Sequence, residues 1–145
     1  MNHYGKQNYR PTQSIGFMIN KARNILTVEM DAALKDLDIS SQQMGILMSL
    51  ALGEAATPFE LSKALGIDTG LMTRMLDKLE SKALIQRSRD MADRRVVNLT
   101  LTSSGRAVAA RIPEIAPVVL NERLKKFTKA ELDELRRLLH KFVGE

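Results

Sequence analysis

Segment 87–102, RSRDMADRRVVNLTLT, restricts the fold of this chain more than any other part of the sequence. Two runs that favour strands, 84–87 and 96–101, lie on either side of a polar turn at 90–94. That arrangement predicts two antiparallel strands joined by a short loop. A hairpin with arginines at its tip has little use in a hydrophobic core, so we expect it to project from the surface as a wing.

Composition sets the size and the charge of the protein. Its 145 residues suit one domain with a single modest core. The net charge is +5, and segment 72–111, with nine basic and four acidic residues, accounts for all of it. This distribution favours a polyanionic partner, although many basic proteins bind none. The lack of cysteine excludes disulfides and thiol redox sensing, and no apolar run is long enough to span a membrane. We expect a cytoplasmic protein that does not bind membranes.

Apolar residues at helical spacing predict helices on both sides of the hairpin. The predicted helices lie at about 12–36, 40–53, 58–65, 69–82, 102–127 and 128–143. Thr57 before Pro58 and Asp68 before the fourth helix are capping signals. Pro113 and Pro117 predict a kink or a break in the fifth helix. Residues 1–11 are polar and are expected to form a loose arm.

The predicted helix at 69–81 divides into two complete faces. Its apolar half consists of Leu71, Met72, Met75, Leu76 and Leu79. Its polar half consists of Thr69, Gly70, Thr73, Arg74, Asp77, Lys78, Glu80 and Ser81. Taken alone, such a pattern is most often an ordinary amphipathic surface helix. Here it follows a two-turn helix and a three-residue turn, the order of a helix-turn-helix, which places its second helix in the major groove of DNA.

The polar half of this helix suits contact with duplex DNA. The small residues Thr69, Gly70 and Thr73 would let the helix backbone approach the base edges. Arg74 could reach a guanine or a phosphate, and Lys78 a phosphate.

Two carboxylates accompany the basic residues. Asp77 lies on the polar half of the helix, where it could pair with Arg74 or accept a hydrogen bond from a cytosine amino group, and the sequence leaves both alternatives open. Asp93 precedes Arg94 and Arg95 at the tip of the hairpin. Such a tip could insert an arginine into the minor groove, with Asp93 orienting it, whereas a solvated charged turn is the plainer alternative.

In combination these segments resemble the MarR family of transcriptional regulators. Segment 93–106, DRRVVNLTLTSSGR, is similar to the family's wing signature, an Asp-x-Arg followed by Leu-Thr and a Gly. Segment 65–87, LGIDTGLMTRMLDKLESKALIQR, is similar to its recognition helix and first wing strand, and the similarity extends over residues 12–143. Ala83 departs from the family, which usually has Gly there. Loss of the easiest left-handed cap predicts a slightly different exit from the helix.

The resemblance implies a mainly helical winged helix-turn-helix fold in one domain, 1–145. The DNA-binding lobe would span 40–102, and the dimerisation helices 12–37 and 105–143. It implies a homodimer on a pseudo-palindromic site in double-stranded DNA with half-sites about one turn apart, and we interpret it as a repressor rather than an activator. It also implies that Arg95 enters the minor groove, that Asp93 braces it, that Arg94 contacts phosphates, and that Thr73 and Arg74 contact DNA.

The resemblance further implies release from DNA by a small aromatic or phenolic acid. Such an effector would bind where the dimerisation helices meet the DNA-binding lobe. The residues expected near it are Tyr9, Arg10, Phe17, Met44 and Met48. Methionines at helical spacing, however, usually fill hydrophobic cores. We expect no other cofactor and no metal ion.

Two other classes of function have less support. An enzyme is disfavoured because the two histidines are far apart in sequence, and no phosphate-binding loop, nucleophile motif or metal-ligand cluster is present. A winged-helix module that binds protein or RNA through its basic face stays open, since fold alone does not determine function.

Overall fold

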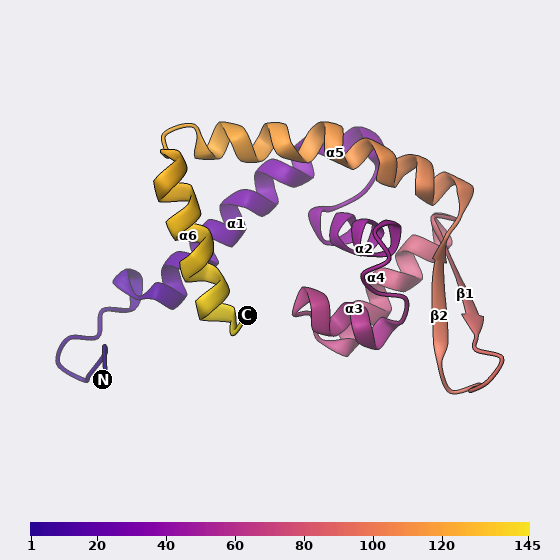
Figure 1. Ribbon diagram of the computed structural model, residues 1–145, viewed down its shortest axis with the longest axis horizontal. Coiled ribbons are helices and arrows are strands. Elements are labelled where there is room, and N and C mark those ends of the chain that lie inside the picture. Colours follow the sequence, from indigo (N-terminus) through magenta and orange to yellow (C-terminus); the bar gives the residue numbers. More distant parts are fainter.

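The computed structural model describes residues 1–145, with a winged lobe at one end of an extended helical frame (Figure 1). In chain order the elements are η1 (Pro11–Gln13), α1 (Ile15–Ala33), η2 (Lys35–Leu37), α2 (Ser41–Ala51), α3 (Pro58–Leu65), α4 (Thr69–Ser81), β1 (Ile85–Arg89), β2 (Val97–Leu101), α5 (Ser103–Leu124) and α6 (Lys129–Val143). The predicted mainly helical fold with a two-stranded wing is confirmed. None of the helices combines the length and the apolar character that a membrane span requires.

One apolar core joins the end of α1 to every element of the lobe. Its largest fully buried side chains are Leu34, Ile46, Leu47, Leu61, Met72, Leu76, Leu79 and Ile85. They come from α2, α3, α4 and β1 and from the residue that ends α1. Each such side chain contributes about 1.5–3 kcal/mol through burial. This core therefore fixes α4 with one face turned inward and the other turned to solvent.

Local capping determines where the two helices of the helix-turn-helix begin and where the first one ends. Thr57 accepts a hydrogen bond from the Glu60 backbone N–H at 3.2 Å, and Pro58 occupies the first turn of α3. Gly66 ends α3 with φ of +62°, in the left-handed region that favours glycine. Asp68 then accepts from the Leu71 backbone N–H at 3.0 Å and caps α4. The predicted caps of both helices are confirmed.

The wing is an antiparallel pair that is anchored at its inner end. Its register runs from Ile85 opposite Leu101 to Arg89 opposite Val97. The Leu99 backbone N–H donates to the Ala56 carbonyl at 2.7 Å, which ties β2 to the loop before α3. The strands begin and end within two residues of the predicted runs, and the hairpin projects beyond the helices (Figure 1).

Helix α5 leaves the wing over a close backbone contact. A Cβ atom at Gly105 would lie 1.9 Å from the Leu84 carbonyl oxygen, so only glycine fits where α5 crosses the start of β1. The predicted kink or break at Pro113 and Pro117 does not divide the helix, which continues to Leu124 (Figure 1). Both prolines are exposed, and the helix continues past them.

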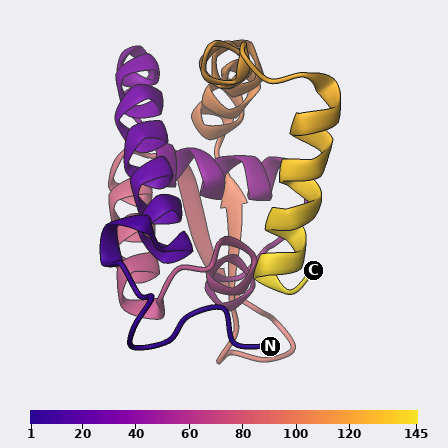
Figure 2. The same ribbon diagram turned by 90° about the vertical axis from the view of Figure 1, so that its left-hand side faces the viewer.

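The other end of the frame is open. Figures 1 and 2 show α1 and α6 extending away from α5 as separate helices. No residue of α6 is buried. The predicted loose arm instead folds back on α1. The Tyr4 hydroxyl accepts from the Ile15 backbone N–H at 3.0 Å, and the Tyr4 ring packs edge-on against Tyr9.

The exit from α4 corrects the prediction for Ala83. Its φ is +56°, and its N–H donates to the Glu80 carbonyl while Leu84 donates to the Leu79 carbonyl. These are the bonds of a left-handed helix cap. The chain therefore leaves α4 as it would with glycine, and a residue with a Cβ atom adopts a backbone conformation that costs about 1–2 kcal/mol.

We expect Ala83→Gly to raise the free energy of unfolding by about 0.5–1 kcal/mol, because relief of left-handed strain exceeds the entropy lost by ordering glycine. Urea unfolding at one fixed protein concentration measures the change. Ala107→Gly is the matched control, since Ala107 is exposed within α5 and its replacement should cost about 1 kcal/mol. Equal destabilisation by both substitutions would contradict this account of Ala83.

Candidate DNA interface

The outward face of α4 consists of the residues that the helical wheel predicted. All eight polar-half residues are exposed, and the apolar half is buried except for Leu71, which is half-buried. The exposed Thr73 hydroxyl donates to the Thr69 carbonyl at 2.9 Å, and its oxygen can still accept a hydrogen bond. At Gly70, a Cβ atom would lie 3.7 Å from Arg74 Nη1, so the Arg74 guanidinium extends toward the start of α4. The start of α4 therefore combines small side chains with the positive charge of Arg74.

Basic side chains of α4 and the wing differ in whether they pair with a carboxylate. Arg74, Lys78 and Arg94 are exposed and form no ion pair with any carboxylate. Arg87 and Arg95 are each paired, Arg87 with α4 and Arg95 within the wing tip. The unpaired class is therefore available to an external anion without the loss of an internal contact.

The structure gives Asp77 a partner that the sequence did not indicate. Its Oδ1 lies 2.6 Å from Arg87 Nη2, on strand β1. Arg74, three residues earlier on the same helix, is not its partner. A partner ten positions along the chain and on another element gives no periodic signal in the sequence.

The wing tip holds Arg95 in one orientation. Asp93 Oδ1 accepts from Arg95 Nε at 3.1 Å, and Asp93 Oδ2 accepts from Arg95 Nη2 at 3.2 Å. The Arg95 backbone N–H also donates to Asp93 at 3.0 Å. These bonds, the side-chain bond first, lower the pKa of Asp93 below its ordinary value. The Arg95 side chain is 90% exposed, so the fork holds it outward rather than burying it.

A second carboxylate, Asp90, organises the loop that carries Arg95, and the sequence analysis missed it. Its Oδ1 accepts from the Ala92 and Asp93 backbone N–H groups at 2.8 and 3.0 Å, and its Oδ2 accepts from Asn98 Nδ2 at 3.0 Å. Asparagine and aspartate at the start of a turn commonly accept from the backbone two and three residues on. That local signal was present in the sequence, whereas the bond from Asn98 depends on strand pairing.

The residues expected near an effector do not come together within the chain. Tyr9 and Arg10 lie in the N-terminal arm, and Phe17 lies in the first turn of α1. Met44 and Met48 lie on α2 in the winged lobe, at the opposite end of α1 (Figure 1). Both methionines pack against the core cluster.

Comparison with known proteins places the chain in a family. The MarR family model matches residues 39–97, from the start of α2 to the start of β2. The multiple antibiotic resistance protein MarR of Escherichia coli is 34% identical over 127 residues, which cover 87% of this chain and 86% of that protein. The chain belongs to the MarR family. It is a DNA-binding transcriptional regulator of the MarR type, and such regulators are not enzymes.

Two of the solved structures that match this chain share its fold. A mutant of E. coli MarR complexed with operator DNA matches with a TM-score of 0.81 at 32% identity, over 88% of this chain and 92% of that one. Bordetella bronchiseptica BpsR, whose DNA binding is regulated by 6-hydroxynicotinic acid, matches with a TM-score of 0.85 at 24% identity, over 94% and 98% of the two chains. The second match, at this identity, concerns the fold alone.

The lowered pKa of Asp90 provides a test of the wing-tip geometry. The bond from Asn98 is the largest cause of that lowering. The ionised Asp90 therefore stabilises the folded protein fully above the ordinary carboxyl pKa. This contribution to the free energy of unfolding is lost as the pH falls through the lower pKa of the folded state. In a carbon-detected NMR titration we expect Asp90 to titrate below its ordinary value, and Asn98→Ala to move its pKa back up. Ser88→Ala, at the position opposite Asn98 on β1, is the control. An Asp90 pKa that Asn98→Ala leaves unchanged would rule out this bond as the cause.

Proposed function

We propose that this MarR-family protein is a cytoplasmic, homodimeric repressor that binds a pseudo-palindromic operator in double-stranded DNA and is released by a small aromatic acid. The observation that carries the proposal is the pairing of an outward α4 face with a braced Arg95 on the adjacent wing. One element suits the major groove, and the other suits the neighbouring minor groove. A dimer that covers its operator would exclude polymerase from overlapping promoter DNA.

Each side chain of the interface has a proposed role. On α4, Thr69, Gly70 and Thr73 permit close approach to base edges, Arg74 contacts a guanine or a phosphate, and Lys78 contacts a phosphate. This assignment is supported by their exposure and by the freedom of Arg74 and Lys78 from internal ion pairs.

On the wing, Arg95 is the proposed minor-groove residue, Asp93 is its brace, and Arg94 contacts phosphates. The two-pronged contact from Asp93 supports this division, because an arginine that is already oriented loses less side-chain entropy when it enters a groove. Its high exposure leaves the side chain within reach of DNA.

We expect Arg95→Ala to weaken operator binding and to lower the slope of log affinity against log salt by about one, because one cationic contact with the DNA is lost. The operator is first selected from random duplex DNA with the wild-type protein, and binding is then measured by fluorescence anisotropy at several salt concentrations. Lys129→Ala removes an equal charge from the exposed start of α6 and should change neither quantity.

Two results would contradict the operator assignment. One is an Arg95→Ala protein with wild-type affinity and salt slope. The other is a wild-type preference for single-stranded RNA, which would favour the alternative of a winged-helix module without operator function.

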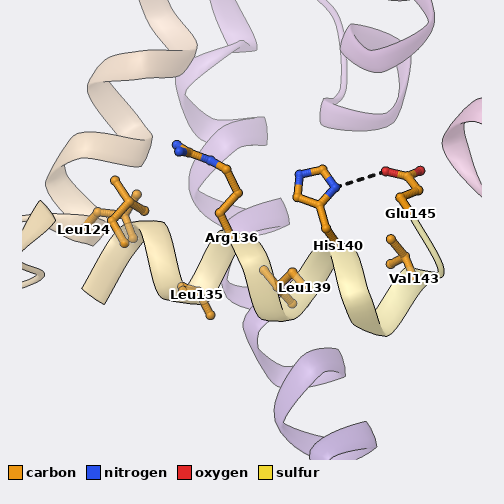
Figure 3. A pocket seen from close by; sticks show the side chains of 8 residues that line it. Leu124, Leu135, Arg136, Leu139, His140, Val143 and Glu145 are labelled. Carbon is orange, nitrogen blue, oxygen red and sulfur yellow. Dashed lines mark ion pairs between the residues drawn. The ribbon is translucent and has the colours of Figure 1, made fainter. Parts of the chain in front are cut away.

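The helices at the open end of the frame support a homodimer. Figure 3 shows Leu124, Leu135, Leu139 and Val143 lining a groove of about 350 Å³ along α6, with His140 paired to Glu145 at its rim. Next to Val143, Phe142 is 63% exposed. An apolar face of this extent on a helix without buried residues is typical of a protein interface. A second copy of the same helices would cover it symmetrically.

We expect Leu139→Glu to convert the dimer into a monomer and to abolish high-affinity operator binding, because a carboxylate would be buried in the apolar interface. Sedimentation velocity distinguishes a species of 16.2 kDa from one of twice that mass. Lys141→Glu, on the polar side of α6, makes a larger change in charge and should remain dimeric. A Leu139→Glu protein that sediments as a dimer would remove this face from the proposed interface.

The proposed effector site is a pocket of about 570 Å³ between α2, β2 and α5. It is lined mostly by apolar side chains, among them Met48, and by Arg106, whose Nη1 donates to the Leu101 carbonyl at 2.9 Å. An apolar pocket with one arginine suits an aromatic carboxylate. BpsR is regulated by 6-hydroxynicotinic acid, so that compound is the first to test for release of the operator.

A further inference from the structure

Arg87 differs from the other arginines of the lobe in where its charge lies. Its side chain is only 29% exposed, whereas that of Arg95 is 90% exposed. Its Nη2 lies 2.6 Å from Asp77 Oδ1, and its Nε lies 3.6 Å from Glu80 Oε2. The Nε atom is buried and forms no hydrogen bond. The guanidinium therefore lies between strand β1 and the second half of α4, facing two carboxylates.

These two carboxylates belong to the face of α4 that is proposed to meet DNA. Asp77 and Glu80 are 59% and 47% exposed, so their free oxygens remain open to an approaching phosphate. An unpaired carboxylate at this face would repel the DNA backbone. Arg87 supplies the opposite charge from the neighbouring strand β1, which lowers that repulsion.

The backbone at Arg87 is held in place by the core. In the wing register Arg87 lies opposite Leu99, which is buried and whose N–H is bonded to Ala56. On the same face of β1, Ile85 is buried in the core and Arg89 Nη1 donates to the Arg94 carbonyl at 3.2 Å. One face of one strand thus contacts the core, α4 and the wing tip in succession.

We propose that Arg87 is a positioning residue for operator recognition: it neutralises Asp77 and Glu80 and fixes the wing relative to α4, without contacting DNA itself. The proposal rests on the operator function proposed above. In Arg87, Nη2 is bonded to Asp77 and Nε is buried, so a phosphate contact would have to use the remaining N–H groups directly beside the Asp77 carboxylate, which repels phosphate. Because a partly exposed ion pair contributes little to folding, the main effect of Arg87 falls on DNA binding.

The test is a double-mutant cycle on the full chain with its selected operator. Arg87→Met is expected to weaken binding by about tenfold, because Asp77 is left unpaired against phosphates. Asp77→Asn alone should change affinity little. The double variant Arg87→Met with Asp77→Asn should recover to within about threefold of wild type, because the carboxylate of the closer pair is then neutral and only the more distant Glu80 lacks its partner. Arg87→Lys keeps the charge without the fork and should fall between wild type and Arg87→Met.

Arg89→Met is the matched control. Arg89 lies on the same strand face, two residues along, and bonds to the wing loop instead of α4. Any loss of affinity that it causes should not be recovered by Asp77→Asn. Thermal unfolding of each free protein separates folding from binding, and if Arg87→Met does not fold, Arg87→Lys with and without Asp77→Asn completes the cycle.

The outcomes separate this inference from the proposed function. Additive effects of Arg87→Met and Asp77→Asn on the free energy of operator binding would overturn it, because additivity is what a direct phosphate contact by Arg87 predicts. A large loss from Asp77→Asn alone would also overturn it, because Asp77 would then contact a base directly. Failure of the wild-type protein to select any duplex sequence would instead refute the operator function itself.

Discussion

The packing of the apolar half of α4 into the lobe is the constraint on which the rest of the structure depends. Met72, Leu76 and Leu79 are almost completely buried among residues of α2, α3 and β1. Because a helix has only two broad sides, that packing turns every polar residue of α4 outward. The wing is fixed to the same core through Ile85 and Leu99. The relative placement of the recognition helix and the wing is thus a consequence of burial, and the polar contacts refine it.

Charge is distributed over this scaffold in a way that a simple count conceals. The basic excess of segment 72–111 equals the whole net charge, yet its arginines are not equivalent. Arg74 and Arg94 are free, Arg95 is held outward by Asp93, and Arg87 is committed to α4. Only charges that are free or outward can release counterions from DNA at no internal cost. Fewer basic side chains are therefore available to DNA than the composition indicates, and Arg95 among them is already oriented.

Much of the fold could be predicted because its signals are local. The limits of α4 follow from the Asp68 cap and from a 3.6-residue period, and both concern neighbouring residues. Where the structure differs from the sequence prediction, the difference depends on context. Pro113 and Pro117 are exposed on a helix that is buried at Ala109 and Ile112, and α5 is not broken there. Ala83 adopts a left-handed conformation because the core on both sides fixes the path of the chain, and that gain exceeds the local strain.

The sequence by itself determined the order of the elements, the two faces of α4, the wing with its basic tip, and the resemblance to MarR regulators. Those properties depend on periodicity, capping and turn residues within a few positions of one another. Only the tertiary structure decided that Asp77 pairs with Arg87 and that Asn98 supports Asp90 in the wing tip. It also decided that the residues expected around an effector lie apart, with Tyr9 at one end of α1 and Met48 at the other. Ion pairs and pockets depend on distances of a few ångströms between elements, and those distances are set by packing in three dimensions.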